Sequence, residues 1–220
     1  MAIATPLSTS GRFIVGADGK RVRLAGVNWY GGSEDIAVPV GLDCTNRTAL
    51  AELIAAQGFN CVRLPFSLWM ARQTAPVPDQ YLLQNPDLHG STPLQVYDAC
   101  VAYFAQMTQA GGYVLDQGIA PVWVGEFGGN ASSLSSPGGG GSWWANIQAW
   151  LKEADVDWCW WALNSTHGQS STPGTSQIQN YWGAPEPYGL LTLDWQDVGY
   201  PAVVTMLQAM MQPRTGPGVG

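Results

Sequence analysis

Ile119-Ala-Pro-Val-Trp-Val-Gly-Glu-Phe-Gly128 is an apolar run that ends in Gly-Glu-Phe-Gly. A short apolar run bounded by turn residues is typical of a strand that is buried on both faces. A Ser/Gly-rich stretch follows, and we then expect a helix because apolar residues recur at helical spacing: Trp144, Ile147, Trp150 and Leu151. The glycine run at 138–142 also fits an engineered linker, but we favour a natural insertion, since long natural loops occur between a strand and its helix. The region predicts one strand–loop–helix unit.

A hairpin and a second unit are expected near the N-terminus. Phe13–Val15 and residues 21–24 would be the arms of the hairpin, because Asp18-Gly19 between them favours the positive φ angles of a tight turn. The second arm continues into a buried strand that ends near Asn28. Residues 46–57 carry leucine and isoleucine on one helical face and stop at a glycine, so they predict a helix.

Two more units complete the chain. Residues 59–64 form an apolar run broken by a proline and predict a strand, and Thr92-Pro-Leu-Gln95 is a capping box that opens a helix ending near residues 111–112. Residues 157–163 predict another strand, followed by a long polar loop and a last helix from Pro201. Four strand–loop–helix units in alternation indicate an α/β fold with parallel strands. A complete eight-stranded barrel needs about 250 residues, so we expect half of one.

Composition limits the classes of partner. The chain has 220 residues, 46% of them hydrophobic, which suits one folded domain, residues 1–220. Its net charge of −7 and its nine Lys and Arg residues argue against nucleic acid as a partner. Eleven Trp and eight Tyr residues are core filler or stacking platforms for sugar rings. No signal peptide or membrane segment is recognisable in the sequence.

The four cysteines give no sign of a metal site, since none of them forms a Cys-x-x-Cys pair. Cys61 and Cys159 lie in apolar runs and are expected to be buried thiols, whereas Cys44 and Cys100 flank helices and could pair in an oxidising compartment. We expect neither a metal nor a cofactor.

Polar residues at the strand ends are the candidates for chemistry, because parallel α/β folds place function at the carboxyl ends of their strands. These residues are Asn28, Arg63, Glu126 and Asn164, of which Asn28 and Asn164 are expected to bind substrate. A carboxylate at the end of a buried strand is costly unless it is paired, so Arg63 is the expected partner of Glu126. The alternative is that the two form a plain ion pair that joins two strand ends.

Three tryptophans near these strand ends could line a sugar-binding cleft, although each of them also suits the core: Trp29, Trp69 and Trp161.

Several motifs resemble glycoside hydrolase family 5 of the cellulase type. They are Leu24-Ala-Gly-Val-Asn-Trp29, Gly58-Phe-Asn-Cys-Val-Arg-Leu-Pro65, Asp87-Leu-His-Gly-Ser-Thr-Pro-Leu-Gln-Val-Tyr-Asp98, Tyr188-Gly-Leu-Leu-Thr-Leu-Asp-Trp195 and, most specifically, the run that ends in Gly-Glu-Phe-Gly. The resemblance implies a (β/α)8 TIM barrel and a retaining hydrolase of β-1,4-glucan, secreted from the cell. It also implies that Glu126 is the nucleophile, that Arg63 orients it and that Trp161 lines the sugar site.

The chain departs from that family in its centre. The second helix leads almost directly into the segment before the seventh strand, with an apparent internal deletion near residues 107–113. Strands three to six of the family would be absent, and with them the Asn-Glu-Pro acid/base. Any substitute acid must come from a loop, and the candidates are Glu34, Glu186 and Asp194.

Three interpretations remain open. The chain is a hydrolase crippled by the loss of its acid, a non-catalytic glucan-binding protein or relic, or the product of a gene deletion that does not fold stably. A half-barrel would have two apolar edges, at residues 59–64 and 119–124, so we weigh a homodimer that completes the barrel against a monomer whose loops cover the edges.

Overall fold

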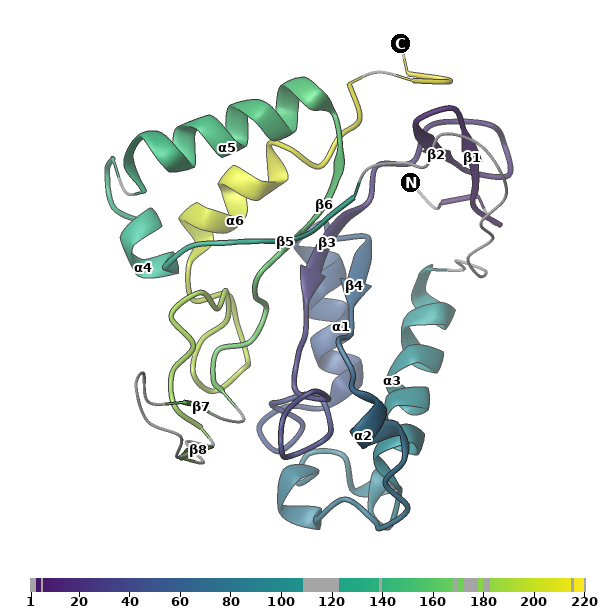
Figure 1. Ribbon diagram of the computed structural model, residues 1–220, viewed down its shortest axis with the longest axis vertical. Helices are drawn as coiled ribbons and strands as arrows, with labels where there is room; N and C mark the ends of the chain where they lie inside the picture. The colour runs from purple at the N-terminus through teal and green to yellow at the C-terminus, as the bar shows by residue number, and fades with distance from the viewer. Residues whose placement is uncertain are drawn as a thin grey trace.

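The computed structural model describes residues 3–4, 6–108, 123–138, 140–167, 170–171, 178–179, 183–214 and 216–219 (Figure 1). Its central sheet has four strands, β3 (Ala25–Asn28), β4 (Cys61–Arg63), β5 (Trp123–Phe127) and β6 (Asp157–Trp160). Their order is β4-β3-β6-β5, and all neighbouring pairs are parallel. This confirms the predicted parallel α/β sheet, and the two edge strands, β4 and β5, come from the segments expected at the edges. The predicted deletion and the predicted end of the helix near 111–112 lie largely outside the described residues.

Four longer helices pack on one face of this sheet: α1 (Arg47–Ala56), α3 (Pro93–Thr108), α5 (Gly141–Ala154) and α6 (Pro201–Gln208). Leu50, Leu151 and Leu207 of these helices join Val27 and Trp158 of the strands in one buried core. Short helices lie in the connections: α2 (Leu68–Ala71), α4 (Ala131–Leu134) and the 3-10 turns η1 (Asp79–Tyr81) and η2 (Pro86–Leu88).

The expected helix signals are present. Asn46 caps α1 by accepting a hydrogen bond from the Thr48 amide, and Gly58 takes the positive φ of 89° beyond its end. The capping box before α3 is formed, with Gln95 Oε1 accepting from the Thr92 amide at 2.9 Å. None of the helices in the described ranges is both long and apolar enough to cross a bilayer.

The opposite face of the sheet carries the polar residues. The ladder places Cys61, Gly26 and Cys159 in one row across three strands. Gly26 leaves room there, because a Cβ on it would come within 2.2 Å of Cys159 Sγ.

All four cysteines are free, so the candidate pair of Cys44 and Cys100 does not form a disulfide. Burial raises the pKa of both of these thiols to about 12.

The amino ends of the strands are closed by buried ion pairs. Arg21 contacts Asp157 at 3.1 Å, and Arg23 contacts Asp155. Asp157 also accepts from the Leu24 amide at 2.7 Å, which fixes the start of β3 against β6.

The N-terminal hairpin differs from the expected one. β2 (Phe13–Val15) pairs antiparallel with β1 (Ser8–Ser10), and the expected second arm contributes one isolated bridge, between Val15 and Arg21. The polar sequence of β1 lacks the alternation that predicts a strand, so this partner was missed. A further small pair, β7 (Ser170–Ser171) with β8 (Ile178–Gln179), lies in the long polar loop.

Candidate active site

Glu126 lies within β5 at the carboxyl end of the sheet, one residue before the strand ends. Val124 pairs with Trp158, whereas Phe127 pairs with Trp160, so β5 has one residue more than β6 over this stretch. Such a bulge re-aims side chains. It lets Val124 and Phe127 both pack toward the helices while Glu126 is about half exposed.

Arg63 of β4 is the polar partner of Glu126. Its guanidinium donates from Nη1 to Glu126 Oε1 at 2.5 Å, and the two side chains are 33% and 51% exposed. The predicted contact is therefore present. The predicted cost of burying Glu126 does not apply, because the carboxylate is open to solvent. The contact instead fixes one oxygen of an accessible carboxylate.

Asn28, at the end of β3, connects all four strands. It is fully buried. Its Oδ1 accepts from Arg63 Nη1 at 2.8 Å, and its Nδ2 donates to the carbonyls of Trp160 and Gly125 at 3.0 and 3.2 Å. Asn28 was predicted to bind substrate, but here its polar atoms serve the protein itself. It positions Arg63, which in turn positions Glu126.

These contacts require a strongly curved sheet. Gly125 lies two strands from Asn28, which in a flat sheet would be roughly 10 Å, beyond the reach of an asparagine side chain. Arg63 and Glu126 belong to the two edge strands of the described sheet and still touch. The polar face is therefore concave, and the pair lies across its opening.

Trp161 follows β6 and has one covered ring face. Its indole stacks on the ring of Tyr30 with centroids 4.7 Å apart and planes 9° from parallel. The Trp161 amide donates to the Phe127 carbonyl at 2.8 Å, and its peptide bond to Ala162 is cis. Trp161 is half-buried. The arrangement suits a stacking platform for a sugar ring.

A buried polar cluster holds Tyr30. The phenol donates to Glu186 Oε2 at 2.6 Å and lies 3.0 Å from His167 Nδ1. Burial, together with the nearby carboxylate of Glu186, raises the pKa of Tyr30, so the phenol keeps its proton. The other Glu186 oxygen accepts from the Tyr188 amide at 2.9 Å.

Three predicted substrate-binding residues lie elsewhere. Trp29 is fully buried in the core and donates from Nε1 to the Val40 carbonyl, so it is not a sugar platform here. Asn164 is also fully buried. Its side chain accepts a hydrogen bond from the Tyr30 amide and donates one to the Tyr30 carbonyl. Trp69, on α2, is 52% exposed and stays available for a ligand.

The candidate acids differ in their surroundings. Glu186 is buried and both of its oxygens are engaged, which makes it a poor proton donor to substrate. Asp194 is exposed, and its hydrogen bond from Thr192 lowers its pKa, which favours the ionised form. Glu34 follows β3 on a half-buried turn, and its charge acts on Tyr30. Of the three, Glu34 is the remaining candidate acid.

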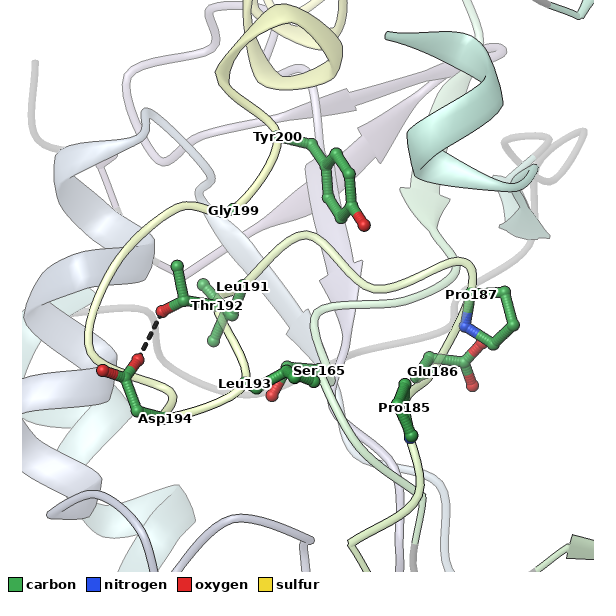
Figure 2. Close-up of a pocket in the computed structure, with 10 residues that line it drawn as sticks. All are labelled: Ser165, Pro185, Glu186, Pro187, Leu191, Thr192, Leu193, Asp194, Gly199 and Tyr200. Atoms are coloured by element: carbon green, nitrogen blue, oxygen red, sulfur yellow. Dashed lines mark hydrogen bonds between the residues drawn. The ribbon is translucent and has the colours of Figure 1, made fainter.

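A cavity of about 530 Å³ lies in the loop after β6 (Figure 2). Glu186 and Pro187 form one wall, and Thr192 with Asp194, joined by a hydrogen bond, form another. Glu126 does not line it. No cluster of three metal-ligating side chains occurs within the described ranges.

Comparison with known proteins gives local sequence matches and a fold match. No family model matches the chain. Over 71 residues it is 46% identical to a glycosyl hydrolase 5 family protein of Chamaecyparis obtusa. This match covers 32% of this chain and 13% of that protein. Over 94 residues it is 39% identical to the major extracellular endoglucanase of Xanthomonas campestris pv. campestris, covering 42% and 19%. The chain thus spans less than a quarter of these curated relatives.

The solved catalytic domain of the Xanthomonas endoglucanase superposes with a TM-score of 0.67 at 15% identity, covering 94% of this chain and 99% of that one. A Pyrococcus horikoshii endocellulase complexed with cellotetraose gives a TM-score of 0.64 at 13% identity, covering 96% and 99%. At such identities the likeness shows the fold alone, that of TIM-barrel endoglucanases.

Sequence reasoning missed Tyr30 and His167. Tyr30 lies two residues after Asn28, and residues at this spacing share a strand face, so the signal was present. His167 lies in a polar loop without periodicity, and nothing local indicates its contact with a residue 137 positions earlier.

Proposed function

We propose that this protein is a glycoside hydrolase of the cellulase type that cleaves β-1,4-glucan with retention of configuration. The observation that carries the proposal is the accessible Glu126 carboxylate, held by Arg63 at the carboxyl end of a parallel sheet. The sequence matches to a family 5 glycosyl hydrolase and to an endoglucanase support the substrate class.

Glu126 would act as the nucleophile. Its free oxygen attacks the anomeric carbon, and the glycosidic bond breaks with its electron pair leaving on the departing oxygen, which in glucan needs a proton from an acid or from water. Water then cleaves the glycosyl ester. Arg63 holds the other carboxylate oxygen, and Trp161 stacks on the sugar before the scissile bond.

The test is the release of reducing ends from soluble β-glucan by wild type and Glu126→Gln. The amide lacks charge and nucleophilicity, so activity should be lost. A Glu52→Gln variant, altered on helix α1, is the matched control and should retain activity. Equal rates for Glu126→Gln and wild type would refute the assignment.

We further propose that the acid is missing, as it would be if the chain lacks the central segment of the family barrel. In the described part of the chain, the Glu126 carboxylate accepts a hydrogen bond from the Arg63 guanidinium and has no hydrogen bond to a second carboxyl group. General acid catalysis contributes about 10²–10⁴-fold, so aryl cellobiosides with good leaving groups should be cleaved far better than glucan. Comparable efficiency on both would reveal a replacement acid, and Glu34→Gln would then be the first variant to examine.

A second candidate function is glucan binding without turnover. The observation that favours it is that Glu126 has no hydrogen bond to a second carboxyl group among the described residues. In that case wild type and Glu126→Gln would bind cellotetraose equally, and neither would cleave an aryl cellobioside.

We also propose a homodimer that completes the barrel. β4 and β5 are the edges of the described sheet, so two copies could pair β4 of each with β5 of the other and complete a barrel. Light scattering coupled to size exclusion tests this, and a folded species at the 23.5 kDa monomer mass would refute the dimer. We also propose export from the cell, since one relative is named an extracellular endoglucanase.

A further inference from the structure

We propose that Glu186 and Tyr30 are positioning residues that set the orientation of the Trp161 indole for sugar binding. The inference rests on the proposed function, because it assumes that Trp161 is a sugar platform. It assigns Glu186 a role other than proton donation.

The ring of Tyr30 backs the platform. It lies 4.7 Å from the Trp161 indole at an angle of 9°, so it occupies one face of that indole. A sugar would therefore use the opposite face. Tyr30 therefore sets the orientation of the Trp161 face that the sugar contacts, because the indole can tilt only as far as the ring stacked on it allows.

Tyr30 itself is held by its hydroxyl. The ring is 3% exposed, and the phenol donates to Glu186 Oε2 at 2.6 Å. A buried hydrogen bond to a carboxyl group is worth more than one between neutral groups. Glu186 cannot follow a shift of Tyr30 freely, because its second oxygen accepts from the Tyr188 amide and its own amide donates to the Ser165 carbonyl.

The segment 186–188 also contacts both neighbours of Trp161, through the side chain of Trp160 and the backbone of Ala162. The Tyr188 carbonyl accepts from Trp160 Nε1 and from the Ala162 amide, both at 3.2 Å. One short stretch of loop thus holds the backbone next to the platform through Ala162 and its ring orientation through Tyr30. His167 adds a second contact at the Tyr30 hydroxyl.

Tyr97 provides a matched control. It is a second buried tyrosine, 6% exposed, whose hydroxyl donates to the Pro65 carbonyl at 2.7 Å. Tyr97→Phe removes a buried hydroxyl group that donates a hydrogen bond, as Tyr30→Phe does, but Tyr97 makes no ring contact with Trp161 among the described residues.

The experiment measures cellotetraose affinity by calorimetry in a Glu126→Gln parent, which does not consume the ligand. Tyr30→Phe keeps the ring stack and loses the anchor, so we expect Kd to rise by about three- to tenfold, within the value of one aromatic contact. Glu186→Ala should give the same rise, and the double variant should add little to it. Glu186→Gln, which keeps an acceptor oxygen, should be intermediate, and Tyr97→Phe should leave Kd within about twofold.

With Glu126 restored, Tyr30→Phe should raise KM for an aryl cellobioside with little change in kcat, since the platform binds ground state and transition state alike. Circular dichroism checks folding, and if Glu186→Ala does not fold, Glu186→Gln and Tyr30→Phe decide. The inference is overturned if these variants change Kd no more than Tyr97→Phe does while Trp161→Ala weakens binding. If Trp161→Ala leaves Kd unchanged, the platform role in the proposed function fails as well.

Discussion

At the amino end of the sheet, Arg21 and Asp157 form an ion pair whose side chains are 1% and 2% exposed, whereas at the carboxyl end Arg63 and Glu126 are 33% and 51% exposed. The chemical groups are the same, and the surroundings differ. The buried carboxylate also accepts a backbone amide, so its bonding capacity serves the protein. Glu126 keeps an oxygen free toward solvent. The surroundings of the first pair suit a role in stability, and those of the second suit the chemistry that we propose.

The largest expected effect is on stability at the amino end. Asp157→Ala leaves Arg21 buried without its partner, and loss of one member of a buried pair costs about 3–5 kcal/mol. Urea denaturation followed by circular dichroism measures the free energy of unfolding. Replacing both members, Arg21→Met with Asp157→Leu, should recover much of the loss. If Asp157→Ala and Glu126→Ala destabilise equally, the contrast between the two ends is wrong.

The next effect is on activity at the carboxyl end. Arg63→Ala removes a charge-assisted hydrogen bond to Glu126, worth about 1.5–3 kcal/mol, so kcat/KM should fall roughly 10- to 100-fold. The free energy of unfolding should change less than for Asp157→Ala, since both partners can be solvated. Arg63→Lys keeps the charge but not the planar fork, and it should restore part of the rate. An Arg63→Ala variant with unchanged kcat/KM would place Arg63 outside the machinery.

Asn28 should combine both kinds of effect, because it is buried and also holds Arg63. Asn28→Ala leaves buried carbonyls of two strands without a donor, which costs about 1–3 kcal/mol of stability, and it frees the guanidinium that orients Glu126. Thermal unfolding and kcat/KM should therefore both decline. A loss of thermal stability alone would give Asn28 a purely structural role, and a loss of kcat/KM alone would limit its role to positioning Arg63.

The smallest effect should come from an ion pair that lies away from the strand ends. Asp87 is 55% exposed and bonds Arg47, which lowers the pKa of Asp87. A lowered carboxyl pKa contributes stability above the ordinary pKa of aspartate, and this is lost as pH falls through the folded value. Asp87→Ala should cost under about 1 kcal/mol at pH 7 and still less near pH 3, measured by urea denaturation. A dependence of the opposite sign would contradict the pairing.

Much of this contrast could be predicted from sequence. Apolar runs that end in a polar residue placed Asn28, Arg63 and Glu126 at one edge of a parallel sheet, because strands of one direction end together. Trp29 was assigned to the wrong side. Strand side chains alternate, so the residue after the inward Asn28 points to the helices, and alternation alone would have corrected this.

Other features depend on interactions distant in sequence. The bulge that exposes Glu126 follows from how β5 pairs with β6, and no local pattern encodes that register. The contact of Tyr30 with Glu186 joins residues 156 positions apart, across a loop without periodicity. Such contacts become visible only once the chain is folded.

The span of the Arg63–Glu126 contact has a consequence for how the proposed activity would be lost. The two residues belong to opposite edge strands, so they meet only while all four strands are in register and curved. Edges open at lower free energy than centres. A preparation that retains its helical signal can therefore have lost its reactive pair through the detachment of one strand. Turnover, followed alongside circular dichroism during denaturation, reports on sheet integrity that helix content does not reveal.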